Sequence, residues 1–146
     1  MHEYSVVTLL NTEEAGWEEA VRTVERICRA KGFYNKTYYI DLRKYRKGQA
    51  PNTDADSTLR RAKWRWFRRV QPELWEKVGR KAPDLLLCLA TQFPPQTIAL
   101  VRGSAARCKA GRLEPADGIF DLVVKSADLS PADAAAAIFE YQAKIR

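Results

Sequence analysis

The chain of 146 residues has a mass of 16.7 kDa, which suits one domain and is short for two. Hydrophobic residues make up 46% and charged residues 29%, which excludes wholesale disorder. No apolar run approaches the roughly 20 residues of a membrane span. Three cysteines (Cys28, Cys88 and Cys108) and one histidine (His2) do not show the spacing of a zinc site, so no metal site of that kind is expected.

The formal net charge of +7 is unevenly distributed along the chain. Residues 1–28 carry a net charge of −4, residues 29–81 carry +11, and residues 82–146 are neutral overall. Like charges gathered in one segment repel each other unless an anionic partner offsets them. Nucleic acid is the commonest such partner, an acidic protein is an alternative, and binding to an anionic membrane is a weaker alternative.

The first third of the chain predicts a strand, a helix and a second strand. Residues 4–10 are apolar and β-branched, which is typical of a buried strand. Apolar residues then recur at three- and four-residue spacing, which predicts a helix over residues 13–31, capped by Asn11 or Thr12 and closed by Gly32. Residues 33–42 predict the second strand.

The next segment predicts a basic helix over residues 58–70. At 100° per residue, its apolar side chains fall within one arc, and its arginines occupy the rest of the circumference. The apolar residues are Leu59, Ala62, Trp66, Phe67 and Val70. Trp64 falls among the arginines, and Pro72 introduces a short helix over residues 73–80.

The last part of the chain predicts three further strands and two helices. Residues 85–90, apolar throughout, predict a strand buried on both faces. Residues 97–101 and 119–124 predict two more strands, and residues 105–110 a short helix between them. Ser130-Pro131 then marks the start of a C-terminal helix that ends at Ile145.

This alternation predicts an α/β fold: a single layered domain over residues 1–146, with helices packed on a sheet of about five strands. We expect the sheet to be mostly parallel or mixed, because the short connection between residues 90 and 97 permits one antiparallel pair.

The charge pattern points to nucleic-acid binding, with single-stranded nucleic acid or RNA slightly preferred. Guanidinium groups suit bidentate contacts to phosphate, and an indole among them can stack on an unpaired base. The basic strand end and loop would form a second wall beside the helix. The predicted nucleic-acid-binding residues are Arg43, Lys44, Arg46, Lys47, Arg60, Arg61, Trp64, Arg65, Arg68 and Arg69.

Two other function classes stay open. An enzyme acting on a phosphate-bearing substrate, as a metal-dependent nuclease or in the manner of a phosphotransferase, would use Arg102, Gly103 and Ser104 as a phosphate-binding turn between a strand and a helix. Asp41, Asp84 and Asp121 would hold Mg²⁺ if they converged. An interaction module for an acidic protein is the third class.

Other site chemistry is sparse in this sequence. Neither common glycine-rich nucleotide loop is present, so no cofactor is identified, and catalytic residues and oligomeric state stay open. Cys28 and Cys88 fall at core positions, whereas the basic neighbours of Cys108 could lower its pKa. Without paired cysteines or a signal-like N-terminus, we expect a cytoplasmic protein.

Overall fold

The computed structural model describes residues 4–43, 45–49, 52–53, 57–60, 82–93, 95–113, 118–126 and 128–145. These residues form one six-stranded sheet in the order β3-β2-β1-β4-β5-β6, and all five neighbouring pairs are parallel. The strands are β1 (Ser5–Asn11), β2 (Tyr34–Asp41), β3 (Thr58–Arg60), β4 (Leu85–Cys88), β5 (Cys108–Gly111) and β6 (Leu122–Val123). The helices within the described residues are α1 (Trp17–Lys31), α5 (Pro95–Gly103) and α6 (Pro131–Ile145).

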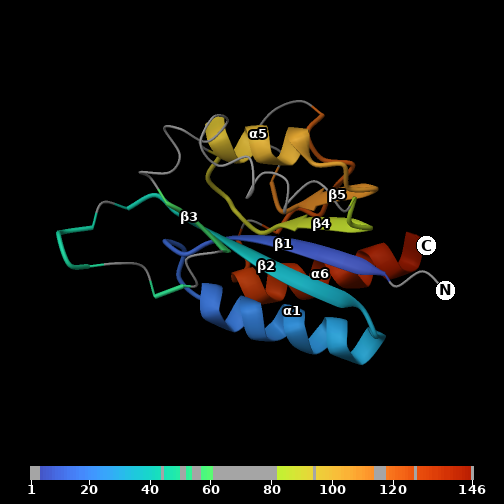
Figure 1. Ribbon diagram of the computed structural model, residues 1–146. Helices are drawn as coiled ribbons and strands as arrows, with labels where there is room; N and C mark the ends of the chain where they lie inside the picture. The colour runs from blue at the N-terminus through green and yellow to red at the C-terminus, as the bar shows by residue number, and fades with distance from the viewer. Residues whose placement is uncertain are drawn as a thin grey trace.

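The helices cover the sheet from both sides. Figure 1 shows α1 and α6 on one face of the sheet and α5 on the other. The chain first builds outward from β1 through β2 to β3, and then returns to place β4 on the other side of β1. This is the doubly wound arrangement, in which the strand order reverses between β1 and β4. The predicted α/β class is confirmed, with six strands rather than about five.

The two central strands are hydrophobic on both faces because helices cover both. Val6, Leu10, Leu85 and Leu87 pack toward α1 and α6, while alternate residues of the same strands pack toward α5. All four residues of β4 are buried, as the continuous apolar run at residues 85–90 predicts. The core is therefore two apolar layers separated by the central strands.

Helix α1 starts later than the sequence predicts and ends where predicted. The Asn11 side chain accepts the Glu13 N–H at 2.9 Å in a turn rather than capping a helix, and α1 begins at Trp17 after Gly16, whose φ is +88°. At the other end Gly32 has a φ of +72° and its N–H bonds to the carbonyl of Arg29, so the predicted glycine stop is confirmed.

Between residues 95 and 111, the structure has a helix where a strand was predicted and a strand where a helix was predicted. The predicted strand at residues 97–101 lies inside α5, where Pro95 is the first residue and Thr97, Leu100 and Val101 are buried on one face at helical spacing. The predicted helix at residues 105–110 is wrong, since Cys108–Gly111 pairs in parallel with β4 as strand β5. Tertiary pairing overrides the helix propensity of the alanines there.

Two further predictions need correction, and one choice between two alternatives is resolved. Thr58–Arg60 is a strand paired with Tyr39–Asp41, so the predicted basic helix does not begin at residue 58; its remainder, and the short helix at residues 73–80, lie outside the described residues. Of the two expected arrangements, mostly parallel or mixed, the described strands adopt the parallel one, since all five of their neighbouring pairs are parallel. The predicted strand at residues 119–124 shortens to β6.

Candidate nucleic-acid interface

The carboxyl ends of all six strands lie at one edge of the sheet, because the strands are parallel. In open α/β sheets, ligands bind outside this edge, at the point where the strand order reverses. Here that point lies between β1 and β4. Two arginine–carboxylate pairs lie along this edge, and they differ in which partner is buried.

The first pair centres on Arg112, which follows β5 and is fully buried. Its Nη1 donates to Glu14 Oε1 at 2.7 Å and to the Leu89 carbonyl at 2.9 Å. Its Nη2 donates to the carbonyls of Leu129 at 2.6 Å and Ser126 at 3.3 Å. These acceptors follow β1, β4 and β6, so one side chain fastens three loops together; we call this arrangement the Arg112 clamp.

The loop between β1 and α1 is acidic. Glu13 and Glu14 lie in the loop, and Glu18 and Glu19 lie in the first turn of α1. In dinucleotide-binding domains this place holds a glycine-rich turn, and the helix N-terminus receives a phosphate. Carboxylates here instead occupy the positive end of the helix dipole. The point of strand reversal is therefore held by the Arg112 clamp and surrounded by negative charge, which disfavours an anion.

The second pair lies at the carboxyl end of β2. Asp41 is 1% exposed and accepts three hydrogen bonds from Arg43: from Nε at 3.0 Å, from Nη2 at 2.9 Å and from the backbone N–H at 3.2 Å. The Tyr45 hydroxyl also donates to Asp41 Oδ2. Arg43 Nη2 reaches Thr12 Oγ1 at 3.5 Å, so the pair is also tied to the end of β1.

These contacts determine the charge of Asp41. Burial alone would raise the pKa of its carboxyl group, but the hydrogen bonds from Arg43 and Tyr45, together with the Arg43 charge, outweigh burial and hold this pKa below its ordinary value. The same hydrogen bond raises the pKa of Arg43, and burial followed by the Asp41 contact raises the pKa of Tyr45. Asp41 is thus a permanent anion at neutral pH, and it orients a permanent cation.

The Arg43 guanidinium is anchored on one side and exposed on the other. Its side chain is 48% exposed, and among the described residues Nη1 has no hydrogen-bond partner. The Tyr45 ring lies 5.7 Å from its central carbon. Arg46 and Lys47 follow in the β2–β3 loop and are exposed. We call Arg43, Arg46 and Lys47 the β2-end basic surface.

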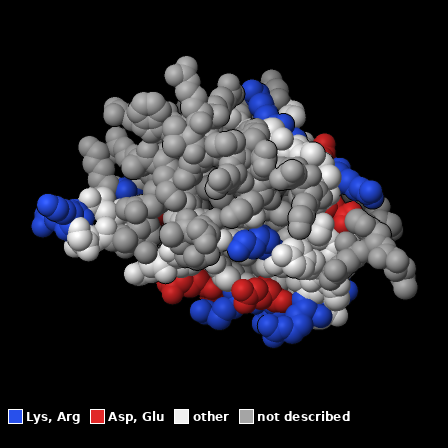
Figure 2. All heavy atoms as spheres, in the orientation of Figure 1, with Lys and Arg blue, Asp and Glu red and all other residues white. Residues whose placement is uncertain are grey.

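The space-filling view places basic side chains at the far end of the β2–β3 loop. In Figure 2, Lys and Arg atoms stand out at the left of the view, where no Asp or Glu of the described residues adjoins them, whereas both signs occur together at the bottom, where α1 lies. The β2-end basic surface therefore lies in a loop that extends past the carboxyl edge of the sheet.

The predicted nucleic-acid-binding residues divide into two groups. Arg43, Arg46 and Lys47 are brought together in the β2–β3 loop, and the Arg60 backbone pairs with Asp41 in the sheet, beside them. The Arg60 side chain lies outside the described part of the structure. So do the other predicted residues Lys44, Arg61, Trp64, Arg65, Arg68 and Arg69.

The predicted phosphate-binding turn has a different structure. Arg102 and Gly103 end helix α5 rather than following a strand, and Ser104 is buried with its hydroxyl accepting the Ala106 N–H at 3.2 Å. A helix C-terminus presents carbonyl groups and a negative dipole end, which repel an anion. The Arg102 carbonyl accepts a hydrogen bond from Lys109 Nζ at 3.3 Å. The prediction that this turn leads from a strand into a helix N-terminus is therefore wrong.

The three aspartates do not converge. Asp41 ends β2 at the carboxyl edge, whereas Asp84 and Asp121 precede β4 and β6 at the opposite edge. Asp84 accepts the Ser5 N–H at 2.8 Å, and Asp121 accepts the Lys109 N–H at 2.9 Å. Across the described ranges, no three His, Cys, Asp or Glu residues gather closely enough to hold a metal ion. The trio therefore gives no support to a Mg²⁺ site.

The cysteines are poor nucleophiles. Cys28 and Cys88 are buried core residues, as predicted, and burial raises the pKa of each to about 11. Burial, with a smaller effect of Asp121, also raises the pKa of Cys108. The expectation that basic neighbours lower the pKa of Cys108 is wrong, because burial and then the Asp121 carboxylate both raise it.

Sequence reasoning named Arg43 and Asp41 in separate roles, but it missed that they pair with each other, and it missed Tyr45 and the Arg112–Glu14 contact. Asp41, Arg43 and Tyr45 alternate at the end of a predicted strand, and this i, i+2, i+4 spacing puts side chains on one face. This spacing is visible in the sequence and could have indicated that the three side chains lie together. The Arg112–Glu14 contact joins residues 98 positions apart, and neither residue lies in a motif.

No helix in the described ranges has the length and apolar character needed to cross a bilayer. The chain matches no protein-family model, no curated protein and no solved structure.

Proposed function

We propose that this protein binds nucleic acid, with single strands or RNA preferred over duplex DNA, through the β2-end basic surface and the arginine-rich segment that follows β3. The observation that carries the proposal is the Arg43 guanidinium, fixed by the buried Asp41 carboxylate and half-exposed at the carboxyl edge. An arginine that is already ordered loses little side-chain entropy when it binds a phosphate.

The neighbours of Arg43 favour a polymer over a single small anion. Arg46 and Lys47, three and four residues after Arg43, continue the positive charge along the β2–β3 loop. The backbone of Arg60 lies in register with Asp41, so the chain enters its arginine-rich segment at the same edge. Successive phosphates of a nucleic-acid strand match such a series of cations.

The aromatic groups favour an unpaired strand. The Tyr45 ring lies beside the Arg43 guanidinium, and its hydroxyl is held by Asp41, so ring and guanidinium share one anchor. Trp64 lies further along the basic segment. Base stacking on an aromatic side chain contributes about 1–3 kcal/mol per base and requires that the base be open.

The salt dependence of oligonucleotide binding tests the proposal. The probe is a fluorescein-labelled 20-mer of deoxythymidine, with the matching uridine 20-mer and a 20-base-pair duplex beside it, followed by anisotropy. For single strands the log–log slope is about −0.7 for each phosphate neutralised. Replacing Arg46 and Lys47 together by Gln should reduce the slope by about 1.4 if each neutralises one phosphate.

The matched control removes the same charge elsewhere. Arg22 and Arg26 are exposed on α1, so the double replacement of these two by Gln should leave the slope unchanged. Equal loss of slope in both double variants would show non-specific attraction to net charge and overturn the proposed surface. Absence of binding by the unmodified protein at low salt would overturn the function itself.

Two further variants separate geometry from charge. Arg43→Lys keeps the positive charge but loses the planar fork that bonds Asp41, so single-strand affinity should fall while the salt slope stays nearly constant.

Trp64→Ala should weaken single-strand binding more than duplex binding; equal losses would remove the stacking role.

A further inference from the structure

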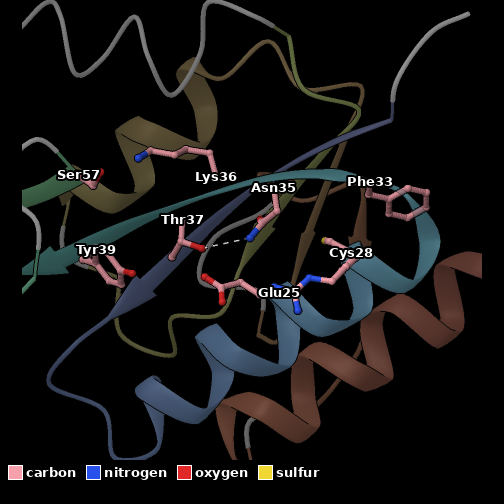
Figure 3. A pocket seen from close by; sticks show the side chains of 9 residues that line it. Glu25, Cys28, Phe33, Asn35, Lys36, Thr37, Tyr39 and Ser57 are labelled. Carbon is pink, nitrogen blue, oxygen red and sulfur yellow. Dashed lines mark hydrogen bonds between the residues drawn. The ribbon is translucent and has the colours of Figure 1, made fainter.

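A groove between α1 and β2 lies apart from the β2-end basic surface and has no place in the proposed function. It has a volume of about 460 Å³, and its lining residues include Glu25 and Arg29 of α1, Asn35 and Thr37 of β2, and Ser57 just before β3. Figure 3 shows Asn35, Thr37 and Glu25 directed into it from the strand and the helix. We infer that this groove receives an extended, acidic peptide segment of a partner protein, which adds to the sheet beside the first half of β2.

No described strand pairs with the outer edge of β2 along this groove. Strand β3 pairs only with Tyr39–Asp41, whereas β1 pairs with Tyr34 through Ile40 on the other side. The backbone of Tyr34 donates to Tyr4, and that of Ile40 accepts from Thr12, so even-numbered residues bond β1. In a parallel ladder the alternate residues then point to the opposite edge. The N–H and C=O groups of Asn35 and Thr37 therefore face the groove edge with no strand partner among the described residues.

The shape of the groove matches a strand. It is lined at one end by Phe33 and at the other by Ser57, the residue before β3, so it runs alongside β2 in line with β3. A peptide placed there would continue the sheet with the spacing that β3 already has. Its backbone would bond Asn35 and Thr37, which is the mode of recognition called strand addition. A compact small molecule would leave these backbone groups unmatched.

The floor of the groove is polar and already ordered. The Thr8 hydroxyl donates to Asn35 Oδ1 at 3.2 Å, and Asn35 Nδ2 donates to Thr37 Oγ1 at 3.5 Å, the contact drawn in Figure 3. Glu25 and Arg29 of α1 supply one charge of each sign at the rim. This lining fits short polar side chains, such as those of threonine or serine, on the groove side of the peptide.

The other face of the peptide would meet a lysine. Lys36 lies between Asn35 and Thr37 and also lines the groove, and Figure 3 shows its side chain on the side of β2 away from Glu25 and α1. Its Nζ lies 5.6 Å from the centre of the Tyr38 ring, so the ammonium group is held near the strand edge. An acidic side chain opposite Lys36 forms a favourable cross-strand pair. A second copy of this chain paired through the same edge would set Lys36 close to its own counterpart, which disfavours self-association.

Amide hydrogen exchange in the free protein is the first test. The Asn35 and Thr37 amides should exchange much faster than those of Tyr34 and Lys36, which bond β1. Equal protection of both sets would mean that the edge is already paired, by another part of the chain or by a second copy, and would overturn the inference.

Titration with a defined peptide is the second test. The probe is acetyl-Thr-Glu-Thr-Glu-Thr-Glu-Thr-amide, followed by amide chemical shifts. The expected result is a shift and slowed exchange at Asn35 and Thr37. A control peptide with lysine at the three acidic positions should bind about fivefold more weakly, the effect of one cross-strand charge pair. A control with proline at the alternate positions whose N–H groups would face β2 lacks those donors and should not bind.

A charge swap makes the assignment specific. Lys36→Glu should reverse the preference, so that the lysine peptide binds more tightly than the acidic one. Shifts confined to Arg43, Arg46 and Lys47 would show that the acidic peptide acts only as a polyanion at the β2-end basic surface, which would refute the groove and leave the nucleic-acid proposal intact. Unchanged preference in Lys36→Glu would also refute it.

Discussion

The two ion pairs at the carboxyl edge bury opposite partners. In the Arg112–Glu14 pair the guanidinium is fully buried and the carboxylate is 24% exposed. In the Arg43–Asp41 pair the carboxylate is buried and the guanidinium is half exposed. A buried charge must be matched by the protein itself, whereas its exposed partner keeps bonding capacity for the outside. The comparison identifies Arg112 as scaffold and Arg43 as the arginine available to a ligand.

The same reasoning explains where this fold puts its positive charge. The strand-reversal point between β1 and β4 is held by the Arg112 clamp and bordered by four glutamates of the β1–α1 loop and helix start. The exposed cations of the β2-end basic surface lie one strand outward, at the end of β2. The anionic ligand that we propose would therefore be directed away from the usual crevice of a doubly wound sheet and toward the β2–β3 loop.

Replacing Arg112 should have the largest effect. Arg112→Met keeps an unbranched side chain but removes the guanidinium, so the Glu14 carboxylate and three loop carbonyls lose the hydrogen bonds that Arg112 donates. We expect a loss of about 3–5 kcal/mol in the free energy of unfolding, the usual cost of removing one partner from a buried ion pair. Urea titration followed by tryptophan fluorescence measures it.

The control for Arg112→Met is Lys144→Met, which breaks the exposed pair with Glu140 and should cost less than about 0.5 kcal/mol. A loss below about 1 kcal/mol for Arg112→Met would show that the clamp is not a main support of the fold, since buried pairs typically cost several times that.

Replacing Asp41 should affect both stability and binding. Asp41→Asn removes the charge that holds the Arg43 fork, and we expect a loss of about 1.5–3 kcal/mol, the range for hydrogen bonds to charged groups. Because Arg43 then loses its orientation, oligonucleotide affinity should fall as well, although net positive charge rises. Affinity that rises with the added charge would contradict the role of Asp41 as a positioning residue.

The pH dependence of the free energy of unfolding at acid pH gives a second test of the role of Asp41. The pKa of Asp41 is lowered in the folded protein, so its contribution is complete above the unfolded value of about 3.9 and is lost as the pH falls through the folded pKa. Urea midpoints between pH 7 and pH 2 should therefore decline less steeply below pH 4 in Asp41→Asn than in the unmodified protein. Parallel curves for the two proteins would show that Asp41 titrates normally.

Local sequence signals predicted the parts of the fold that are themselves local. The apolar period of α1, its glycine stop and the continuous apolar run of β4 all identify their elements from neighbouring residues alone. The segment from Pro95 to Gly111 was misread because strand and helix there are short, and pairing with β4 decides between them.

The sequence predicted only the part of the candidate site that a local charge pattern reveals. Arg43, Arg46 and Lys47 were identified from charge alone, since a run of cations is visible in the sequence. The function of Asp41 as their anchor depends on its burial, which the sequence does not reveal by composition. The Arg112 clamp depends on loops brought together by the sheet order, so no local pattern indicates it.

Replacing Glu14 should have the smallest effect and gives the most direct check of the comparison. Glu14→Gln keeps an acceptor for Arg112 Nη1 and removes only the charge, while the three carbonyls continue to accept from Arg112. We expect a loss of about 1 kcal/mol or less, well below that of Arg112→Met, because the exposed partner of a pair is partly compensated by water. If Glu14→Gln cost as much as Arg112→Met, the carboxylate itself would be the support of the clamp. Exposure of one partner would then not distinguish scaffold from ligand-binding arginines, and the assignment of Arg43 to a ligand would lose its basis.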